Sequence, residues 1–225
     1  YQGDVTVRDA LQMSLNVPAV QLLEAVGTPA LFSRLRRAGA EPVLPKAETP
    51  GLATGLGGLG LSLKDLVQLF AALGSKGNAV SLYDGVNGQP SEPVRAAVLA
   101  SQAAWQIIDI LGGIPQPDGS APAPIAYKTG TSYGYRDAWT IGFDGRHVIG
   151  VWVGRPDNAS VPGITGGGTA APILFEAYHR SGLKPALLTS PPSGAVVLAK
   201  HDLPASLQRF AKTGTRLVKV AKGAG

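Results

Sequence analysis

The sequence predicts a mixed α/β (α+β) fold in which helices flank an antiparallel sheet. Three observations support this prediction. Apolar residues recur at helical spacing through most of the first 111 residues. Residues 125–154 instead hold three short runs rich in β-branched and aromatic side chains, separated by turns. Finally, 30 Gly and 18 Pro among 225 residues indicate many turns between short elements.

Three short helices are expected at the N-terminal end. Thr6 begins the first one, because an acidic residue three positions later completes a capping-box pattern. It ends at the stretch Ser-Leu-Asn-Val-Pro, where we expect Val17 to be extended because it precedes proline. Pro18 then opens a second helix, which Gly27 ends, and residues 28–38 form a third. The stretch Ser-Leu-Asn therefore lies in a tight corner between two helices.

Two further helices precede the predicted sheet. A Pro/Gly-rich loop covers residues 41–61, and Ser62 then resembles the cap of a helix that continues to about residue 74. Residues 91–111 are expected to form one longer helix. Its apolar side would comprise Val94, Val98, Trp105, Ile108 and Leu111.

The predicted strands are residues 125–132, 137–143 and 147–154, most simply joined as an antiparallel meander. A last helix over residues 169–183 follows them. We expect its apolar stripe to consist of Ile173, Leu174, Ala177 and Tyr178.

Charge divides the chain into two parts. Residues 1–179 carry 12 Lys/Arg against 14 Asp/Glu, whereas residues 180–225 carry 8 against 1. The folded part therefore has no field that would attract nucleic acid. We assign residues 1–184 to one domain, and residues 185–225 to a basic Pro/Ser-containing linker or tail that is solvated and partly disordered.

Several classes of site are excluded or disfavoured by composition. The chain has no Cys, so it has no disulfide, thiolate nucleophile or Cys-ligated metal. His147, His179 and His201 lie far apart without metal-ligand spacing, and no cofactor is implied. No apolar run approaches the roughly 20 residues that span a bilayer. The chain lacks both an initiator Met and a signal-peptide pattern, so we expect a fragment.

A candidate site lies in the first strand, where Lys128-Thr129-Gly130-Thr131 precedes a hairpin turn. A lysine cation, two hydroxyls and a glycine that leaves the backbone open would suit a carboxylate-ended substrate along the strand. The alternative is an ordinary exposed strand end. The same four letters recur at 212–215, in the basic tail and without strands around them, where we interpret them as coincidence.

A second motif is the glycine run of residues 55–60, which matches the dinucleotide pattern G-x-G-x-x-G. That pattern requires a buried strand directly before the first glycine, and residues 45–54 do not form one. We therefore interpret the run as a turn-rich loop.

Four stretches together resemble the transpeptidase domain of class A penicillin-binding proteins, and within that family the 1C type. They are VTVRDALQMSLNVPAVQLLEAVG, GLATGLGGLGLSLKDLVQLFAALG, IAYKTGTSYGYRDAWTIGFDGRHVIGVWVGRPD and AAPILFEA. They occur in the family's order across about the first 180 residues. The resemblance implies a fold like that of the serine β-lactamases, here incomplete at its N-terminus.

This family uses three motifs, S-x-x-K with the nucleophile, S-x-N, and K-T-G. Ser14-Leu15-Asn16 matches the second motif and Lys128-Thr129-Gly130 the third. The first motif is missing, because in the family it precedes S-x-N. The string at 181–184 has the letters S-x-x-K but follows the K-T-G strand, so the family's order excludes it.

The resemblance also implies a role for each matched residue. Ser14 would relay a proton to the leaving group, and Asn16 would bind the substrate's peptide backbone. Lys128 would supply positive potential and hold Ser14. The hydroxyls of Thr129 and Thr131 would bind the substrate carboxylate, with Gly130 between them, and the Thr131 N–H would form half of an oxyanion hole.

The implied activity is that of a serine-type D-Ala-D-Ala transpeptidase, which cross-links peptidoglycan stem peptides and is acylated by β-lactams. The intact protein would be a bifunctional synthase of the bacterial envelope, with a glycosyltransferase domain and a membrane anchor upstream and this domain on the extracytoplasmic face. This chain alone is expected to be inactive. Two alternatives remain, a non-catalytic module that binds peptidoglycan or a partner, and a serine β-lactamase or DD-carboxypeptidase relative.

Two structural expectations follow from this assignment. Ser14 and Asn16 should face Lys128 across a cleft, whereas Lys212 should be exposed in the tail. Because the helix that carries the nucleophile would fill the centre of the domain, its absence should leave apolar surface exposed and stability low.

Overall fold

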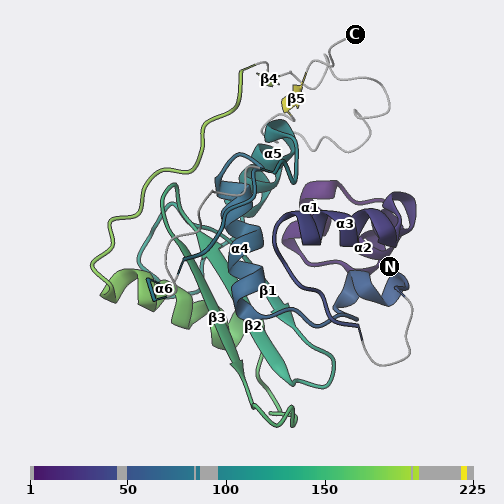
Figure 1. Cartoon of the computed structure of the whole chain (residues 1–225). Coiled ribbons are helices and arrows are strands. Elements are labelled where there is room, and N and C mark those ends of the chain that lie inside the picture. Colours follow the sequence, from purple (N-terminus) through teal and green to yellow (C-terminus); the bar gives the residue numbers. More distant parts are fainter. Residues whose placement is uncertain are drawn as a thin grey trace.

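A central three-stranded sheet separates two layers of helices, as Figure 1 shows. The computed structural model describes residues 3–44, 50–83, 85–86, 96–193, 195–197 and 219–221. Helices α4 (Leu63–Gly74) and α5 (Ser101–Leu111) cover one face of the sheet, and α6 (Ala171–Arg180) covers the other. The remaining helices form a group beside strand β1 (Ala126–Thr131), as Figure 1 shows.

The sheet is the predicted antiparallel meander. Its strands are β1 (Ala126–Thr131), β2 (Asp137–Phe143) and β3 (Val148–Gly154), in the spatial order β1-β2-β3. In the register, Lys128 lies opposite Ile141 and Gly130 opposite Trp139. Among the described residues, β1 is therefore an edge strand, with one side free of strand pairing.

The first two helices bracket the corner that contains Ser-Leu-Asn. They are α1 (Val7–Gln12), capped by the Thr6 side chain, and α2 (Asn16–Val26). The prediction that Val17 is extended was wrong, because α2 begins two residues before Pro18. Proline is tolerated there, since the N–H groups of a helix's first turn have no partner within the helix.

Three elements follow as the sequence predicts. Helix α3 (Thr28–Arg37) buries Phe32 and Leu35. A 3₁₀ turn, η1 (Leu52–Leu56), lies within the glycine-rich loop and packs on α2, and no strand precedes it in the described residues. In α4, the Ser62 hydroxyl and the Asp65 carboxylate form the reciprocal capping box.

Helix α5 is shorter than predicted. It begins at Ser101, so Val98 is buried in the loop before it and not on the helix, while residues 91–95 lie outside the described residues. The reason is tertiary. The segment at 96–99 binds the turn after α4 through the backbone, with Ala79 N donating to Ala96 O and Val98 N to Gly77 O, both at 2.8 Å. These bonds remove the segment from the helix.

A π-helical turn, η2 (Gly166–Ala170), leads directly into α6. The prediction that Ile173 belongs to the apolar stripe of α6 was wrong, because Ile173 is 47% exposed. The buried side chains of this helix are Ala171, Leu174, Phe175 and Tyr178. The stripe is rotated by one position, because η2 and the sheet fix which side of the helix faces inward.

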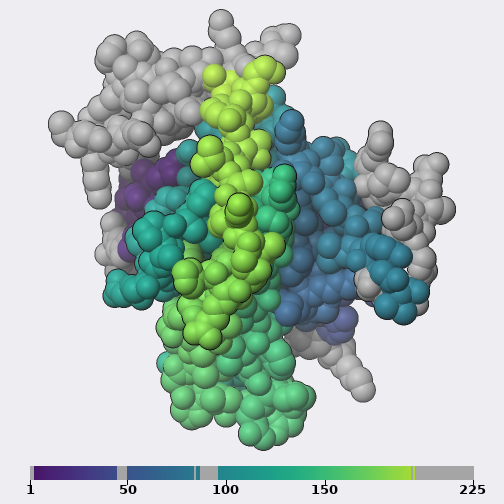
Figure 2. Space-filling model, turned by 90° about the vertical axis from the view of Figure 1, so that its left-hand side faces the viewer, coloured from purple at the N-terminus to yellow at the C-terminus, as the bar shows by residue number. Residues whose placement is uncertain are grey.

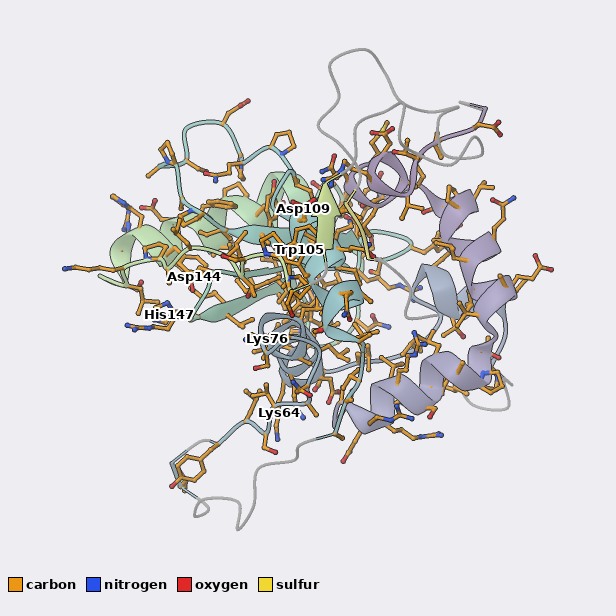
Figure 3. The ribbon with its side chains drawn as sticks, turned by 90° about the horizontal axis from the view of Figure 1, so that it is seen from above. Lys64, Lys76, Trp105, Asp109, Asp144 and His147 are labelled. Carbon is orange, nitrogen blue, oxygen red and sulfur yellow. The ribbon has the colours of Figure 1, made fainter. Side chains whose placement is uncertain are left out.

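The segment after α6 runs back along the surface of the molecule, as Figure 2 shows in yellow-green. It is tied to the β2–β3 turn, where Ala186 N donates to Asp144 Oδ2 at 3.3 Å. The same carboxylate accepts from the backbone N–H groups of Arg146 and His147 at 2.6 Å and lies 3.1 Å from the His147 ring (Figure 3). The side chain of Asp144 is fully buried there.

The C-terminal region contains a strand pair that the sequence analysis did not predict. Strands β4 (Ala195–Val197) and β5 (Lys219–Ala221) are antiparallel, with Val196 opposite Val220. The expectation that no strands lie around residues 212–215 was therefore wrong, whereas the assignment of residues 185–225 to a basic linker or tail stays a prediction. The second Lys-Thr-Gly-Thr and His201 lie outside the described residues, so the expectation for Lys212 stays a prediction.

Candidate active site

The corner between α1 and α2 gives Ser14 an unusual backbone conformation. Its φ of 53° lies in the left-handed region, which is uncommon for a residue other than glycine. The turn is held by two backbone bonds, from Ser14 N to Leu11 O and from Leu15 N to Ala10 O. The corner thus stores backbone strain at a residue that the sequence analysis selected as functional.

The end of α5 anchors this corner. Arg8 forms an ion pair with Asp109 at 2.5 Å, and the Gln12 side chain donates to Ile110 O at 2.7 Å. Because α5 also packs on β1, these contacts fix the position of α1 relative to the sheet. The position of Ser14 therefore depends on a contact between Gln12 and Ile110, which are almost 100 positions apart in the sequence.

The structure brings Lys128 into contact with Ser14, although 114 residues separate them. The Lys128 Nζ donates a hydrogen bond to Ser14 Oγ and a second one, of 2.8 Å, to the carbonyl of Thr129. Burial lowers the pKa of the Lys128 ammonium below its usual value. This lysine therefore releases a proton more readily than an exposed lysine does.

One cavity of about 530 Å³ collects all six residues that the sequence analysis selected. Its polar lining consists of Ser14, Asn16, Lys128, Thr129, Gly130 and Thr131. Its apolar lining comes from α1, α2 and η1, including Val7, Leu22 and Leu56. Those three side chains are 64%, 54% and 51% exposed, so the cavity presents uncovered apolar surface.

Thr131 also contacts an element that the sequence analysis did not connect with the site. Its Oγ1 accepts a 3.0 Å hydrogen bond from Gly166 N, at the start of η2. One available sequence signal was the run of three glycines at 166–168. Another was Thr140, a polar residue within the otherwise mostly apolar run of residues 138–143, which the structure shows to be fully buried.

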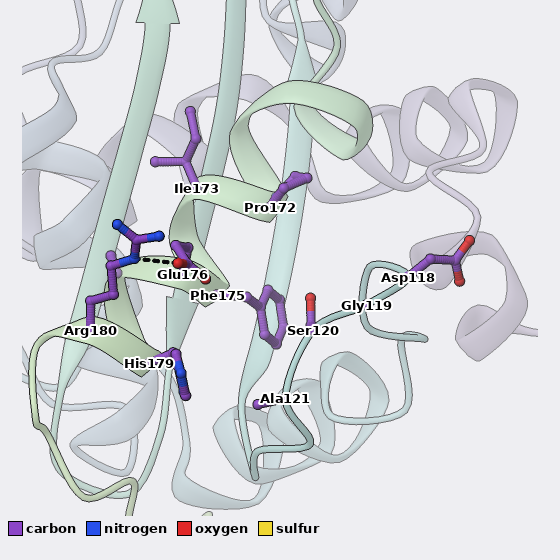
Figure 4. Close-up of a pocket in the computed structure, with 11 residues that line it drawn as sticks. Asp118, Gly119, Ser120, Ala121, Pro172, Ile173, Phe175, Glu176, His179 and Arg180 are labelled. Atoms are coloured by element: carbon purple, nitrogen blue, oxygen red, sulfur yellow. Dashed lines mark hydrogen bonds and ion pairs between the residues drawn. The ribbon is translucent and has the colours of Figure 1, made fainter.

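A second cavity, of about 830 Å³, lies on the outer side of α6 (Figure 4). The loop at 118–121 forms one wall, and α6 forms the other with Ile173, Glu176, His179 and Arg180. Glu176 and Arg180 pair with each other. None of the six selected residues lines this cavity, so we do not assign the candidate chemistry to it.

The S-x-x-K string at 181–184 lies away from the candidate site. Ser181 is the C-terminal cap of α6, its hydroxyl donates to Tyr178 O at 3.1 Å, and neither Ser181 nor Lys184 lines the cavity of Lys128. Within the described ranges, no cluster of three His, Cys, Asp or Glu side chains could hold a metal ion. No helix among those residues has the length and apolarity needed to cross a membrane.

Comparison with known proteins identifies the fold and the family. No protein-family model matches the sequence. Penicillin-binding protein 1C from Escherichia coli strain K12 is 42% identical over 179 residues, covering 77% of this chain and 23% of that protein. The crystal structure of penicillin-binding protein 1A from Haemophilus influenzae matches 99% of this chain and 41% of its own, with a TM-score of 0.74 and 20% identity.

A third match is penicillin-binding protein A from Mycobacterium tuberculosis, solved as an imipenem acyl-enzyme complex. It is 25% identical, with a TM-score of 0.62 over 79% of this chain and 48% of that one. The fold is thus the serine β-lactamase-like fold of penicillin-binding transpeptidases. The chain belongs to the penicillin-binding protein family and spans about a quarter of the length of its curated relatives.

Proposed function

We propose that this chain forms the S-x-N and K-T-G part of a peptidoglycan DD-transpeptidase site. In the intact protein, the site would cross-link stem peptides by acyl transfer and would be acylated by β-lactams. One observation carries the proposal, namely the hydrogen bond from Lys128 to Ser14 in a cavity that all six motif residues line. If the motif matches were accidental, residues 114 positions apart in the sequence would not be expected to line the same cavity.

In this proposal, the Ser14 hydroxyl passes a proton between the nucleophile's base and the leaving group. Such a relay requires links of about 3 Å, and its contact with Lys128 holds the hydroxyl in place. The lowered pKa of Lys128 reduces the cost of sharing a proton with that hydroxyl. Asn16, at the first turn of α2, binds the substrate's peptide backbone from the opposite wall.

The free edge of β1 receives the substrate in this assignment. The hydroxyls of Thr129 and Thr131 bind its terminal carboxylate, and the Thr131 N–H contributes to the oxyanion hole. Gly130 lies between them. Packing within the protein does not require a glycine there, because an added Cβ would lie 3.7 Å from the Trp139 Cβ, an ordinary contact. Space for a bound ligand therefore explains a glycine at position 130 better than packing within the protein does.

The nucleophilic serine is proposed to come from sequence outside these 225 residues. The exposed apolar wall formed by Val7, Leu22 and Leu56 supports this, because it offers a seat for an apolar helix beside Ser14. With that serine, the site would form an acyl-enzyme on the penultimate D-Ala carbonyl and pass the acyl group to a neighbouring amine. This chain alone would then be inactive.

The wider context follows from the same proposal. The intact protein would be a class A synthase of the bacterial envelope, with a glycosyltransferase domain and a membrane anchor upstream of this domain. The transpeptidase domain would then act on the extracytoplasmic face, where peptidoglycan is assembled. Its partners would be stem peptides ending in D-Ala-D-Ala.

Labelling with a fluorescent penicillin tests the proposal. The intact protein should acquire a label that survives boiling in detergent, whereas the 225-residue chain should not. The adduct should map to an S-x-x-K serine upstream of Ser14. An adduct on Ser181 would show that the wrong string was dismissed. If the intact protein binds peptidoglycan but takes no covalent label, a non-catalytic binding module is the better assignment.

A further inference from the structure

Gly166 lies directly behind the Lys-Thr-Gly-Thr strand and is bound by two strands at once. Its N–H donates to Thr131 Oγ1 of β1 at 3.0 Å. Its carbonyl accepts from Thr140 Oγ1 of β2, also at 3.0 Å. Both polar groups of this backbone residue are therefore fixed by side chains of the sheet, on the side opposite the helices α4 and α5.

No side chain fits at Gly166. A Cβ added there would lie 2.5 Å from Gly130 O, 2.7 Å from Trp139 O and 2.9 Å from Gly130 N. All three are backbone atoms of the sheet, so they cannot move aside as the end of a flexible side chain can. Any larger residue would therefore push η2 away from β1 and lengthen the hydrogen bond to Thr131.

The direction of that hydrogen bond determines what the Thr131 hydroxyl can do. A backbone N–H only donates, so Thr131 Oγ1 must be the acceptor, and its single hydrogen must go elsewhere. Within the part of the chain that the structure describes, this hydroxyl donates to no protein acceptor. Thr131 is exposed and lines the cavity of Lys128, so the hydrogen is available to a group bound in that cavity.

Thr140 supports Gly166 from a completely buried position. Its side chain is 0% exposed, and its hydroxyl hydrogen is shared between Gly166 O and Trp139 O, at 3.0 and 2.9 Å. A hydroxyl buried in a strand is costly unless it forms such bonds. Its contact with Gly166 fixes the orientation of the backbone that presents the N–H to Thr131.

We propose that Gly166, supported by Thr140, is a positioning residue that makes the Thr131 hydroxyl a hydrogen-bond donor toward the ligand's carboxylate. The inference rests on the proposed function for the identity of that ligand. An ionised carboxylate accepts hydrogen bonds and cannot donate them, so a hydroxyl whose hydrogen is directed into the cavity recognises it. A neutral ester accepts a weaker bond at the same place and should lose less when the constraint is removed.

The test uses the intact protein and measures acylation rates with benzylpenicillin and with its methyl ester, followed by mass spectrometry of the adduct. Gly166→Ala should lower the acid-to-ester rate ratio about tenfold, the scale of one charge-assisted hydrogen bond. Gly167→Ala is the matched control, because a Cβ at Gly167 meets nothing within 4 Å. Its rate ratio should equal that of the unsubstituted protein.

A second arm separates positioning from a general structural effect and remains available if Gly166→Ala does not fold. Thr140→Val should lower the same ratio about threefold, and Thr140→Ser should restore it. When Thr131 is already replaced by Val, neither Gly166→Ala nor Thr140→Val should lower the acid-to-ester rate ratio further. The hydroxyl that Gly166 and Thr140 position is then absent.

The possible failures are distinguishable. Equal ratios for Gly166→Ala and Gly167→Ala, or losses that simply add in the Thr131→Val background, would overturn the positioning role while leaving the proposed function intact. If the unsubstituted protein is not acylated at all, the proposed function fails and this inference fails with it.

Discussion

The two sides of strand β1 differ sharply in how they are packed. On the α6 side, Tyr127, Leu174 and Phe175 are each no more than 5% exposed, and the Tyr127 and Phe175 rings meet edge to face with centroids 5.2 Å apart. On the side of α1 and α2, the cavity wall leaves Val7 and Leu22 more than half exposed. One side thus holds the strand, and the other leaves its edge open.

The two sides of β1 therefore differ in role. The packed side fixes the backbone of β1, which in turn fixes where Lys128 and the two threonine hydroxyls lie. The cavity on the open side is lined by the polar groups that the proposed reaction needs. Substitutions on the packed side should therefore change the free energy of unfolding, and those on the open side should change acylation.

The largest expected effect is on the open side. Lys128→Ala should abolish penicillin acylation of the intact protein, a loss of about 10²–10³-fold or more, because it removes a preorganised charge and releases Ser14. Fluorescent penicillin labelling over a time course measures it. Lys212→Ala, in the second copy of the motif, is the matched control and should label normally. Equal labelling of both variants would refute the assignment of the two copies.

The next effect lies on the packed side. Leu174→Ala should cost about 2–5 kcal/mol of unfolding free energy, because it leaves a cavity at a side chain that is 0% exposed. Leu22→Ala, in the open cavity wall, should change the unfolding free energy by only about 0.5 kcal/mol. Urea denaturation of the 225-residue chain compares the two. Similar costs would show that the two sides do not differ in packing as described.

A pH-dependent effect follows from Asp144 at the β2–β3 turn. Burial would raise the pKa of this carboxyl, but the hydrogen bonds from His147 and Arg146 outweigh it and hold the pKa below its usual value. The stabilisation is therefore complete above the unfolded-state pKa of about 3.9 and is lost as the pH falls through the lower folded-state value.

Asp144→Asn should accordingly cost about 1–3 kcal/mol at pH 7, where the native carboxylate is ionised, and progressively less in acid. Urea denaturation at pH 7, 5, 3 and 2 for both proteins measures this. A difference between them that stays constant down to pH 2 would contradict the role given to the ionised carboxylate. Acylation of the intact protein at pH 7 should change little, because Asp144 does not line the cavity of Lys128.

The smallest expected effect is at the start of α4. Ser62→Ala should lower the unfolding free energy by about 1 kcal/mol, because the Asp65 N–H loses its 3.1 Å bond to the Ser62 hydroxyl. Ser33→Ala, at an exposed position within α3, is the control and should be nearly neutral. Thermal melts of both variants check this. A loss for Ser62→Ala no larger than that for Ser33→Ala would indicate that the cap contributes little.

Local patterns in the sequence determined much of this fold. Alternation and turn residues were sufficient for strands β1 to β3, and the capping signals at Thr6 and Ser62 marked two helix starts. These local signals work because each depends on residues fewer than about ten positions apart. The six site residues, Ser14, Asn16 and Lys128 to Thr131, were instead selected by the resemblance of four longer stretches to a known family, and they line one cavity.

Only the tertiary structure decided the rest. The start of α5 depends on backbone bonds to Gly77, and the exposure of Ile173 depends on how η2 meets the sheet. The contact between Ser14 and Lys128 and the clamp of Gly166 by Thr131 and Thr140 join segments 26 to 114 residues apart. Whether such groups meet is fixed by the packing of whole elements against one another, which no short stretch of sequence encodes by itself.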